Sequence, residues 1–418
     1  MRVSRLTAIA SIAMATVLAA GCGGGDSGSS GSSGSNGSTT LTWFMWSGSD
    51  VEKNAWLHIA DMVHQKYPDI TIKFETTPFN DFWTKLTTQA ASGNTACIIG
   101  LQGQRAPQFG NLLVPLDDYM SKAGIKASDY VPSITKGLQF NGKQVALPYD
   151  VGPFVMFYNK DAFKAAGLKE PAMGWTTDEF MSDAKALTKP PKYGFWAQSD
   201  IGALLPWVLS SSGKSALNAE GKLDVDNPEW HTSAQWYTDL VSKEKVAAQI
   251  PSANSSSSTA NQFLAGNAYM ALDGPWDLIN AREQAKFKVG IAPMPAGASG
   301  SKTWSDGSGF GITKDCKNPD QAFKAISVIV GTEAETYLGN LGRAYPALIA
   351  TQKSWYEGNK TQDVKPVMDY SLTNSVPYAT TPTWQQVVTT FSKQAVATYN
   401  GQGTVDDLLS QTQAQGGS

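Results

Sequence analysis

The sequence contains few of the residues that build metal centres and highly charged surfaces. Among its 418 residues are three cysteines and three histidines, and charged residues make up 17%. The histidines (58, 64 and 231) are scattered and the cysteines lack zinc-like spacing, so we expect no metal site and no cofactor. A formal net charge of −3 gives no electrostatic surface for nucleic acid, which we do not expect as a partner.

Long apolar runs are also missing, apart from one segment near the N-terminus. That segment, Leu6–Ala20, is about 15 residues long, shorter than the roughly 20 residues that cross a bilayer as a helix. It follows Arg2 and Arg5, and small residues lead from it to Cys22. A basic start, a short apolar stretch and a small-residue cleavage site predict a secretory signal over residues 1–22.

The end of this signal, Leu18-Ala19-Ala20-Gly21-Cys22, resembles a bacterial lipobox, in which the cysteine is acylated and becomes the new N-terminus. The sequence departs from that pattern at Ala19, where leucine is usual. Residues 23–40 are almost wholly glycine and serine, which is typical of a flexible coil. We therefore expect a lipid anchor at Cys22 and a flexible tether on the outer side of the cell membrane. The alternative is ordinary secretion with an incidental cysteine.

The part of the chain after the tether has about 375 residues, too many for one compact core and enough for two domains. Its first part alternates apolar β-rich runs with helical patterns, and Ser49 and Glu52 have the spacing of a helix-capping box. The predicted strands are 41–46, 70–74 and 96–101, and the predicted helices are 51–63 and 80–91. This order indicates a parallel α/β sheet with right-handed crossovers.

The α/β pattern starts again further along the chain and predicts a second α/β unit. Thr176 and Glu179 have the spacing of another capping box. The predicted strands are 151–158, 193–197, 268–272 and 289–292, and the predicted helices are 161–166, one opening at 176, 229–244, 385–398 and 405–411.

Several motifs, in a fixed order along residues 41–415, match one known family. They are Tyr67–Ile72, Leu86–Gly93, Leu147–Asp150, Phe157–Phe163 with Ala166–Leu168, Phe263–Met270 with Gly274–Trp276, Ala292–Gly297 and Gly403–Leu409. In these motifs the chain resembles the sugar-type (family 1) extracellular solute-binding proteins of bacterial ABC importers, the maltose-binding-protein-like family. One departure is that Ala96 and Cys97 stand in the third strand where family members usually carry an aspartate.

The resemblance implies an α/β fold of the two-lobe periplasmic-binding-protein type (class II), with a ligand cleft between lobes joined by crossing strands. Lobe I would contain residues 41–149 and 307–343, and lobe II residues 150–306 and 344–418. The chain would cross between the lobes near Tyr149–Gly152, Ser305–Gly309 and Gly342–Pro346.

The same resemblance implies a monomeric, non-enzymatic protein that captures a mono- or oligosaccharide and delivers it to the permease subunits of an ABC importer. Thirteen Trp and 14 Tyr in a weakly charged chain suit this function, because aromatic rings bind the apolar faces of sugars.

Trp276 is the first candidate for a ligand-binding residue, because Gly274-Pro275-Trp276 matches the stacking tryptophan of the family. Arg105 offers a planar donor group for neighbouring hydroxyls, although it could instead pair with Asp117 or Asp118. The alternative is that the tryptophans serve as core residues and Asp150 as a hinge. The other candidates are Trp46, Ser47, Gln104, Asp150, Asp200, Trp304, Arg343, Tyr345 and Trp384.

The implied fold also suggests a disulfide between Cys97 and Cys316. Cys97 would begin the third strand of lobe I, at the end away from the cleft. The strand 309–313 would run antiparallel to it, so Cys316 would emerge at the same end. If the two strands are neighbours, the sulfurs can meet in an oxidising compartment.

Other functions remain open at this point. A glycoside hydrolase needs two carboxyl groups on either side of one bond. Asp150, Asp273 and Asp306 could converge, but their spacing identifies no pair. The same fold could carry a polyamine, phosphate or iron instead of a sugar, and a surface adhesin is a further alternative.

Overall fold

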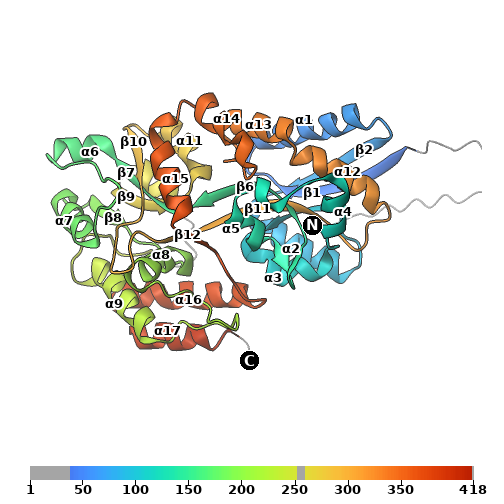
Figure 1. Ribbon diagram of the computed structural model, residues 1–418. Helices are drawn as coiled ribbons and strands as arrows, with labels where there is room; N and C mark the ends of the chain where they lie inside the picture. The colour runs from blue at the N-terminus through green and yellow to red at the C-terminus, as the bar shows by residue number, and fades with distance from the viewer. Residues whose placement is uncertain (1–37, 252–258, 417–418) are drawn as a thin grey trace, which may run out of the picture. The chain divides into compact units, whose positions relative to one another are not determined.

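The structure is a computed structural model that describes residues 38–251 and 259–416 (Figure 1). Cys22, the predicted signal peptide and residues 23–37 of the predicted tether lie outside the described residues. Within the described ranges, no helix is both long and apolar enough to cross a membrane.

The larger sheet contains the first part of the chain. Its strands follow the order β12-β11-β3-β1-β2, and β6 also pairs with β11. The first three strands are parallel, as predicted, and β11 runs antiparallel to β3. The strands are β1 (Thr39–Trp46), β2 (Ile70–Thr77), β3 (Ile98–Gln102), β6 (Leu147–Pro153), β11 (Thr303–Ile312) and β12 (Ser375–Pro377).

The helices of this part begin where the sequence predicted. Ser49 accepts a hydrogen bond from the backbone N–H of Glu52 (3.2 Å) at the start of α1 (Asp50–Lys66). The Glu52 carboxylate in turn accepts the N–H of Gly48 (2.9 Å), so the cap is reciprocal although displaced by one residue. The other elements around this sheet are α2 (Phe79–Ala91), α3 (Ala106–Phe109), α4 (Asp117–Ala123), α5 (Pro132–Gly137), α12 (Pro319–Ile329), α13 (Thr332–Asn340), α14 (Gln352–Gly358), α15 (Lys365–Thr373) and the hairpin β4 (Gln139–Phe140) and β5 (Lys143–Gln144).

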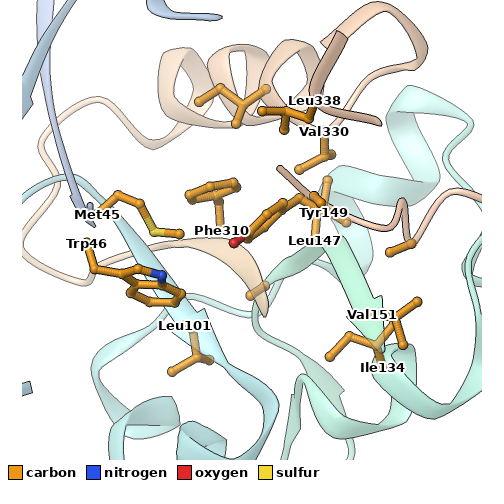
Figure 2. Close-up of a cluster of buried hydrophobic side chains, with 14 of the residues drawn as sticks. Met45, Trp46, Leu101, Ile134, Leu147, Tyr149, Val151, Phe310, Val330 and Leu338 are labelled. Carbon is orange, nitrogen blue, oxygen red and sulfur yellow. The ribbon is translucent and has the colours of Figure 1, made fainter. Parts of the chain in front are cut away.

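A large aromatic and aliphatic core packs against this sheet (Figure 2). The rings of Tyr149 on β6 and Phe310 on β11 stack with centroids 5.1 Å apart. Figure 2 shows Val330, which directly follows α12, and Leu338 of α13 above these two rings. The same core therefore joins β6 and β11 to α13 and to the end of α12.

The smaller sheet has four strands in the order β10-β7-β9-β8. They are β7 (Val155–Asn159), β8 (Tyr193–Trp196), β9 (Ala268–Asp273) and β10 (Val289–Ala292). Its helices include α7, which opens with the complete capping box of Thr176 and Glu179. The helices are α6 (Lys160–Ala165), α7 (Thr177–Leu187), α8 (Ile201–Ser212), α9 (Pro228–Ser242), α10 (Thr259–Leu264), α11 (Pro275–Gln284), α16 (Trp384–Tyr399) and α17 (Val405–Gln413).

One predicted strand is wrong. The sequence indicated a single strand over 151–158, but the structure has β6 in the larger sheet and β7 in the smaller one, separated at Phe154. Pro153 ends the pairing of β6 with β11, and the N–H of Phe154 donates to the carbonyl of Trp304 (3.0 Å). Because both halves are apolar, periodicity alone cannot reveal that the chain changes sheets here.

Three chain segments lie side by side where the two sheets meet. β6 pairs antiparallel with β11 from Pro153 to Leu147. The segment around Tyr345 and Pro346 joins them, because Val151 N–H donates to Tyr345 O (3.0 Å) and Ala347 N–H donates to Tyr149 O (3.2 Å). These are the three segments expected to cross between the lobes, and Figure 1 shows β6 and β11 between the other strands of the two sheets.

A disulfide joins Cys97, which directly precedes β3, to Cys316, which follows the end of β11. Their Cα atoms are 4.4 Å apart and they are separated by 219 residues in sequence. The strands are neighbours, with Ile98 opposite Ile312, and Thr313 N–H donates to Cys97 O (3.0 Å). The bond therefore connects two segments of the larger sheet that come from distant parts of the chain.

We expect the exported protein to contain this disulfide and to lose stability without it. In the chain-entropy model a bond that closes so long a loop contributes about 5 kcal/mol to the free energy of unfolding. Mass spectrometry of unreduced peptides should find Cys97 linked to Cys316, and the Cys97→Ser/Cys316→Ser double variant should melt at a lower temperature. Two free thiols, or equal melting temperatures, would contradict this.

Candidate functional site

Four aromatic rings form a nearly parallel stack beside the junction of the two sheets. Trp304 lies between Phe154 (centroids 4.5 Å, planes 17° apart) and Tyr378 (4.7 Å, 18°). Trp276 lies next to this trio, with its ring 6.5 Å from that of Trp304 and inclined by 16°. The stack draws its rings from four separate segments of the chain, so only the tertiary structure creates it.

Trp276 is the exposed member of the stack. It is 38% exposed, whereas Phe154, Trp304 and Tyr378 are between 6% and 8% exposed. Trp276 stands at the start of α11, directly after β9, and its ring packs against Gly152 of β6. A Cβ atom at Gly152 would lie 2.6 Å from Pro275 and 3.0 Å from the Trp276 ring, so glycine is needed there. One side of the ring is thus held by the protein while part of it faces solvent.

Two carboxyl groups lie on the paired strands beside the stack. Asp150 on β6 accepts a hydrogen bond from the N–H of Ser308 on β11 (2.6 Å). Burial raises the pKa of Asp150 to about 6, against the opposing charge of Arg343. Asp306 on β11 is 6% exposed, and its Oδ2 has no hydrogen-bond partner among the described residues. Burial raises the pKa of Asp306 to about 7; the N–H of Gly307 opposes this shift and the charge of Asp150 adds to it.

Arg105 reaches the same region from the larger sheet. It belongs to the short turn Gly103–Arg105 that follows β3, and its guanidinium lies 5.1 Å from the ring centroid of Trp83. Burial lowers the pKa of Arg105, while the nearby Tyr378 and Asp306 oppose that shift. Within the described ranges Arg105 forms no ion pair, so the alternative pairing with Asp117 or Asp118 does not occur.

Three hydrogen bonds between side chains and the backbone support this arrangement. The carbonyl of Gln104 accepts a hydrogen bond from the hydroxyl of Thr380 (2.6 Å), which fixes the segment after Tyr378 against the turn that carries Arg105. Asp200 caps α8 by accepting the N–H of Gly202 (2.7 Å), and the carbonyl of Gly202 accepts the indole N–H of Trp304 (2.7 Å). Asp200 therefore acts on the stack through the position of Trp304.

The structure places Arg343 and Tyr345 apart from the stack. Arg343 forms an ion pair with Glu52 of α1, and its guanidinium lies 5.5 Å from the ring centroid of Trp56. The Tyr345 hydroxyl hydrogen-bonds that of Tyr356 (2.9 Å), and Tyr345 is only 2% exposed. Both side chains connect the third crossing segment to the core of the larger sheet.

Three further candidates are packed within the protein or turned to their own backbone. Trp46 is 7% exposed and lies against Phe79 and Trp83, with centroids 5.4 and 5.5 Å away. Trp384 is 2% exposed and meets the ring of Tyr378 edge-on (5.8 Å, 90°). The Ser47 hydroxyl donates to the carbonyl of Ser49 (2.8 Å).

The sequence thus identified part of this cluster and missed the rest. Trp276, Trp304, Arg105, Asp150 and Asp200 come together as candidates. Phe154 was missed because it appeared to be the middle of a strand, and Asp306 was considered only as a possible hydrolase carboxyl group. Tyr378 lies in a loop after β12, where no local signal marks it.

A separate pocket lies beside the first turns of α11. It is lined by Phe157, Phe263, Leu264, Ala271, Asp273, Asp277, Asn280 and Ala281. Burial and the neighbouring Asp277 raise the pKa of Asp273 well above its usual range. The lining is mostly apolar and contains none of the stacked rings, although its Asp273 carboxyl group lies near the side chain of Trp276. In the described part of the chain, no three His, Cys, Asp or Glu side chains come together as metal ligands.

Comparison with known proteins places this geometry in a family. Residues 58–336 match the family described as bacterial extracellular solute-binding protein. A binding protein of Brucella abortus is 26% identical over 373 residues, covering 83% of this chain and 85% of that protein. The arabinooligosaccharide-binding protein of Bacillus subtilis is 23% identical over 300 residues, covering 69% of each chain. The ABC substrate-binding protein of Listeria monocytogenes in complex with cycloalternan has the same fold, with a TM-score of 0.81 and 22% identity over 90% of this chain and 97% of that one.

We expect the buried carboxyl groups to make the unliganded protein less stable as the pH rises. An aspartate in an unfolded chain has a pKa of about 3.9. Because the pKa values of Asp150 and Asp306 are raised to about 6 and about 7 in the folded state, their contribution to stability is present at low pH and is lost between about pH 4 and pH 7. The melting temperature should therefore fall less between pH 5 and pH 8 for Asp306→Asn than for the wild type. An equal fall in both proteins would contradict this.

Proposed function

Because the chain belongs to the family of bacterial extracellular solute-binding proteins, we propose that it captures a carbohydrate between its lobes and delivers it to an ABC importer. The observation that carries the carbohydrate assignment is the exposed face of Trp276 at the edge of the aromatic stack, beside Asp150, Asp306 and Arg105. The protein would bind its solute without converting it.

The chemistry of sugars fits this surface. A sugar ring has an apolar face that packs on an indole, and hydroxyl groups around its edge that need hydrogen-bond partners. Trp276 offers the apolar face, and the carboxyl and guanidinium groups offer an acceptor and a donor. The comparisons support the same class of ligand, since one relative is named for arabino-oligosaccharides and one structural neighbour was solved with cycloalternan.

We place the ligand contacts on both lobes, with lobe I as residues 41–149 and 307–343 and lobe II as residues 150–306 and 344–418. Trp276 from lobe II would stack on the sugar, while Arg105 and Gln104 from lobe I and Asp150 at the crossing would bind hydroxyls. Trp304, Asp200 and Trp384 would act behind Trp276, by holding the stack in place. Trp46, Ser47, Arg343 and Tyr345 would need to change their present contacts to touch a ligand.

The proposal extends to the N-terminus. Lipidation of Cys22 and a glycine- and serine-rich tether over residues 23–40 would keep a monomeric binding protein close to the permease subunits of its importer, on the outer side of the membrane. The tether composition supports free reorientation of the folded part.

A thermal-shift screen tests the function. The panel contains glucose, arabinose, maltotriose, arabinotriose and cycloalternan, with spermidine, phosphate and iron as the other solute classes. A ligand that binds only the folded state adds about 2.7 kcal/mol of apparent stability at one hundred times its Kd, so a bound sugar should raise the melting temperature clearly. A response to spermidine, phosphate or iron alone would contradict the carbohydrate assignment. Chromatography of the incubated sugars should find them unchanged, whereas hydrolysed products would favour the glycoside hydrolase.

The Trp276→Ala variant tests the aromatic platform. Loss of an aromatic anchor costs about 2 kcal/mol of binding free energy, which is about thirtyfold in affinity for the sugar identified by the screen. The melting temperature of the unliganded variant should stay near that of the wild type, because the ring is 38% exposed. Met173→Ala is the matched control, since Met173 is 53% exposed and lies outside the proposed contacts. Unchanged affinity in Trp276→Ala would contradict the platform.

A further inference from the structure

Gly274, at the start of α11, is an unexpected residue for its backbone position. Its φ of −120° and ψ of 170° are those of extended backbone, which any residue adopts. It is also the N-cap of the helix, where serine, aspartate and asparagine are preferred because their side chains accept a backbone N–H. Other helices of this chain open with such a cap, at Ser49, Asn159, Thr176, Asp200, Asn227 and Thr404. The local backbone therefore does not explain a glycine at position 274.

The space around Gly274 supplies the reason. A Cβ atom added to Gly274 would lie 2.2 Å from Cη2 of Trp276 and 2.3 Å from its Cζ2 and Cζ3. These three atoms form the outer edge of the indole, so the ring occupies the space that a side chain would fill. Non-bonded carbon atoms pack at about 3.5–4.0 Å, so even a methyl group cannot share this space with the ring. Gly274 is thus required by Trp276 and not by the helix that it begins.

Gly152 of β6 bounds the same ring from a distant part of the chain. A Cβ atom there would lie 3.0 Å from Cζ3 of Trp276. The ring of Phe154, two residues further on, lies 6.4 Å from that of Trp276 and is inclined by 20°. Asp273 accepts the N–H of Gly274 (2.8 Å) and lies near the Trp276 side chain. Backbone from β6 and from the turn between β9 and α11 therefore holds one edge of the ring, while Trp276 stays 38% exposed.

We propose that Gly152 and Gly274 are positioning residues, which form a seat for the indole of Trp276 and hold it in the orientation that receives a ligand. A side chain that is already oriented loses little conformational freedom when the ligand binds, so more of its contact energy contributes to affinity. A side chain at position 274 would turn the ring out of the seat, because the three atoms nearest to its Cβ all belong to that partly exposed ring. The inference rests on the proposed function, in which Trp276 is the platform for a sugar.

Gly274→Ser tests the seat, because serine suits both the extended backbone and the N-cap. Calorimetry with maltotriose, arabinotriose and cycloalternan should find a weaker affinity than in the wild type, by up to the roughly thirtyfold expected for Trp276→Ala. The Gly274→Ser/Trp276→Ala double variant should bind like Trp276→Ala alone, since no ring is left to displace. Gly331→Ser is the matched control and should bind as the wild type does. Gly331 is the extended N-cap of α13, and its added Cβ would lie nearest to Ser327 O, outside the proposed contacts.

Melting temperatures provide a readout that needs no sugar. In the Trp276→Ala background serine caps α11 without meeting a ring, so its effect on the melting temperature should be more favourable there than in the wild type. An equal effect in the two backgrounds would show that the ring does not require the glycine and would overturn the inference. Wild-type affinity in Gly274→Ser, or a further loss in the double variant, would also overturn it. A wild type that binds none of the probes would contradict the proposed function, whereas the melting comparison would still decide whether Gly274 seats the ring.

Discussion

The antiparallel pairing of β6 with β11 is the constraint on which the rest of the structure depends. β11 pairs with β3 and β12 as well, so one strand joins the larger sheet to the segment that leads into the smaller one. The pairing is close because glycines alternate along β11: a Cβ at Gly307 or Gly309 would collide with the carbonyl oxygens of Asp150 or Leu147. Backbone hydrogen bonds, which do not depend on side-chain identity, thus fix the geometry at the junction, and the side chains that leave these strands are free to serve the site.

Some side chains at the junction are suited to binding a ligand and lower the stability of the unliganded protein. The cores of both sheets are dense with aromatic residues, whereas Asp150 and Asp306 bring carboxyl groups into the junction, where burial raises their pKa values. Burying an unpaired polar atom lowers the free energy of unfolding by about 1–3 kcal/mol. We propose that the carboxyl groups beside the exposed indole of Trp276 are kept at this cost because they contribute to binding a ligand that has hydroxyl groups and an apolar face.

Much of the local structure could be predicted, because it depends on neighbours in sequence. The parallel α/β order of the larger sheet and the starts of α1 and α7 follow from apolar periodicity and from Ser49 and Thr176 as caps. The change of sheet at Phe154 could not be predicted, because both halves of the predicted strand are apolar. Trp276 could be singled out by its motif, but nothing local separates it from Trp384, which is nearly fully buried.

The sequence by itself determined the alternation of strands and helices in the first part of the chain, the scarcity of metal-ligating residues and the family motifs. Only the tertiary structure decided which of these residues meet. Asp306 contacts Gly103, Trp304 stacks on Phe154 and Tyr378, and Cys97 bonds Cys316, all across long stretches of chain. The physical reason is that periodicity states which face of a helix or strand is buried, whereas strand order and register decide what that face is buried against.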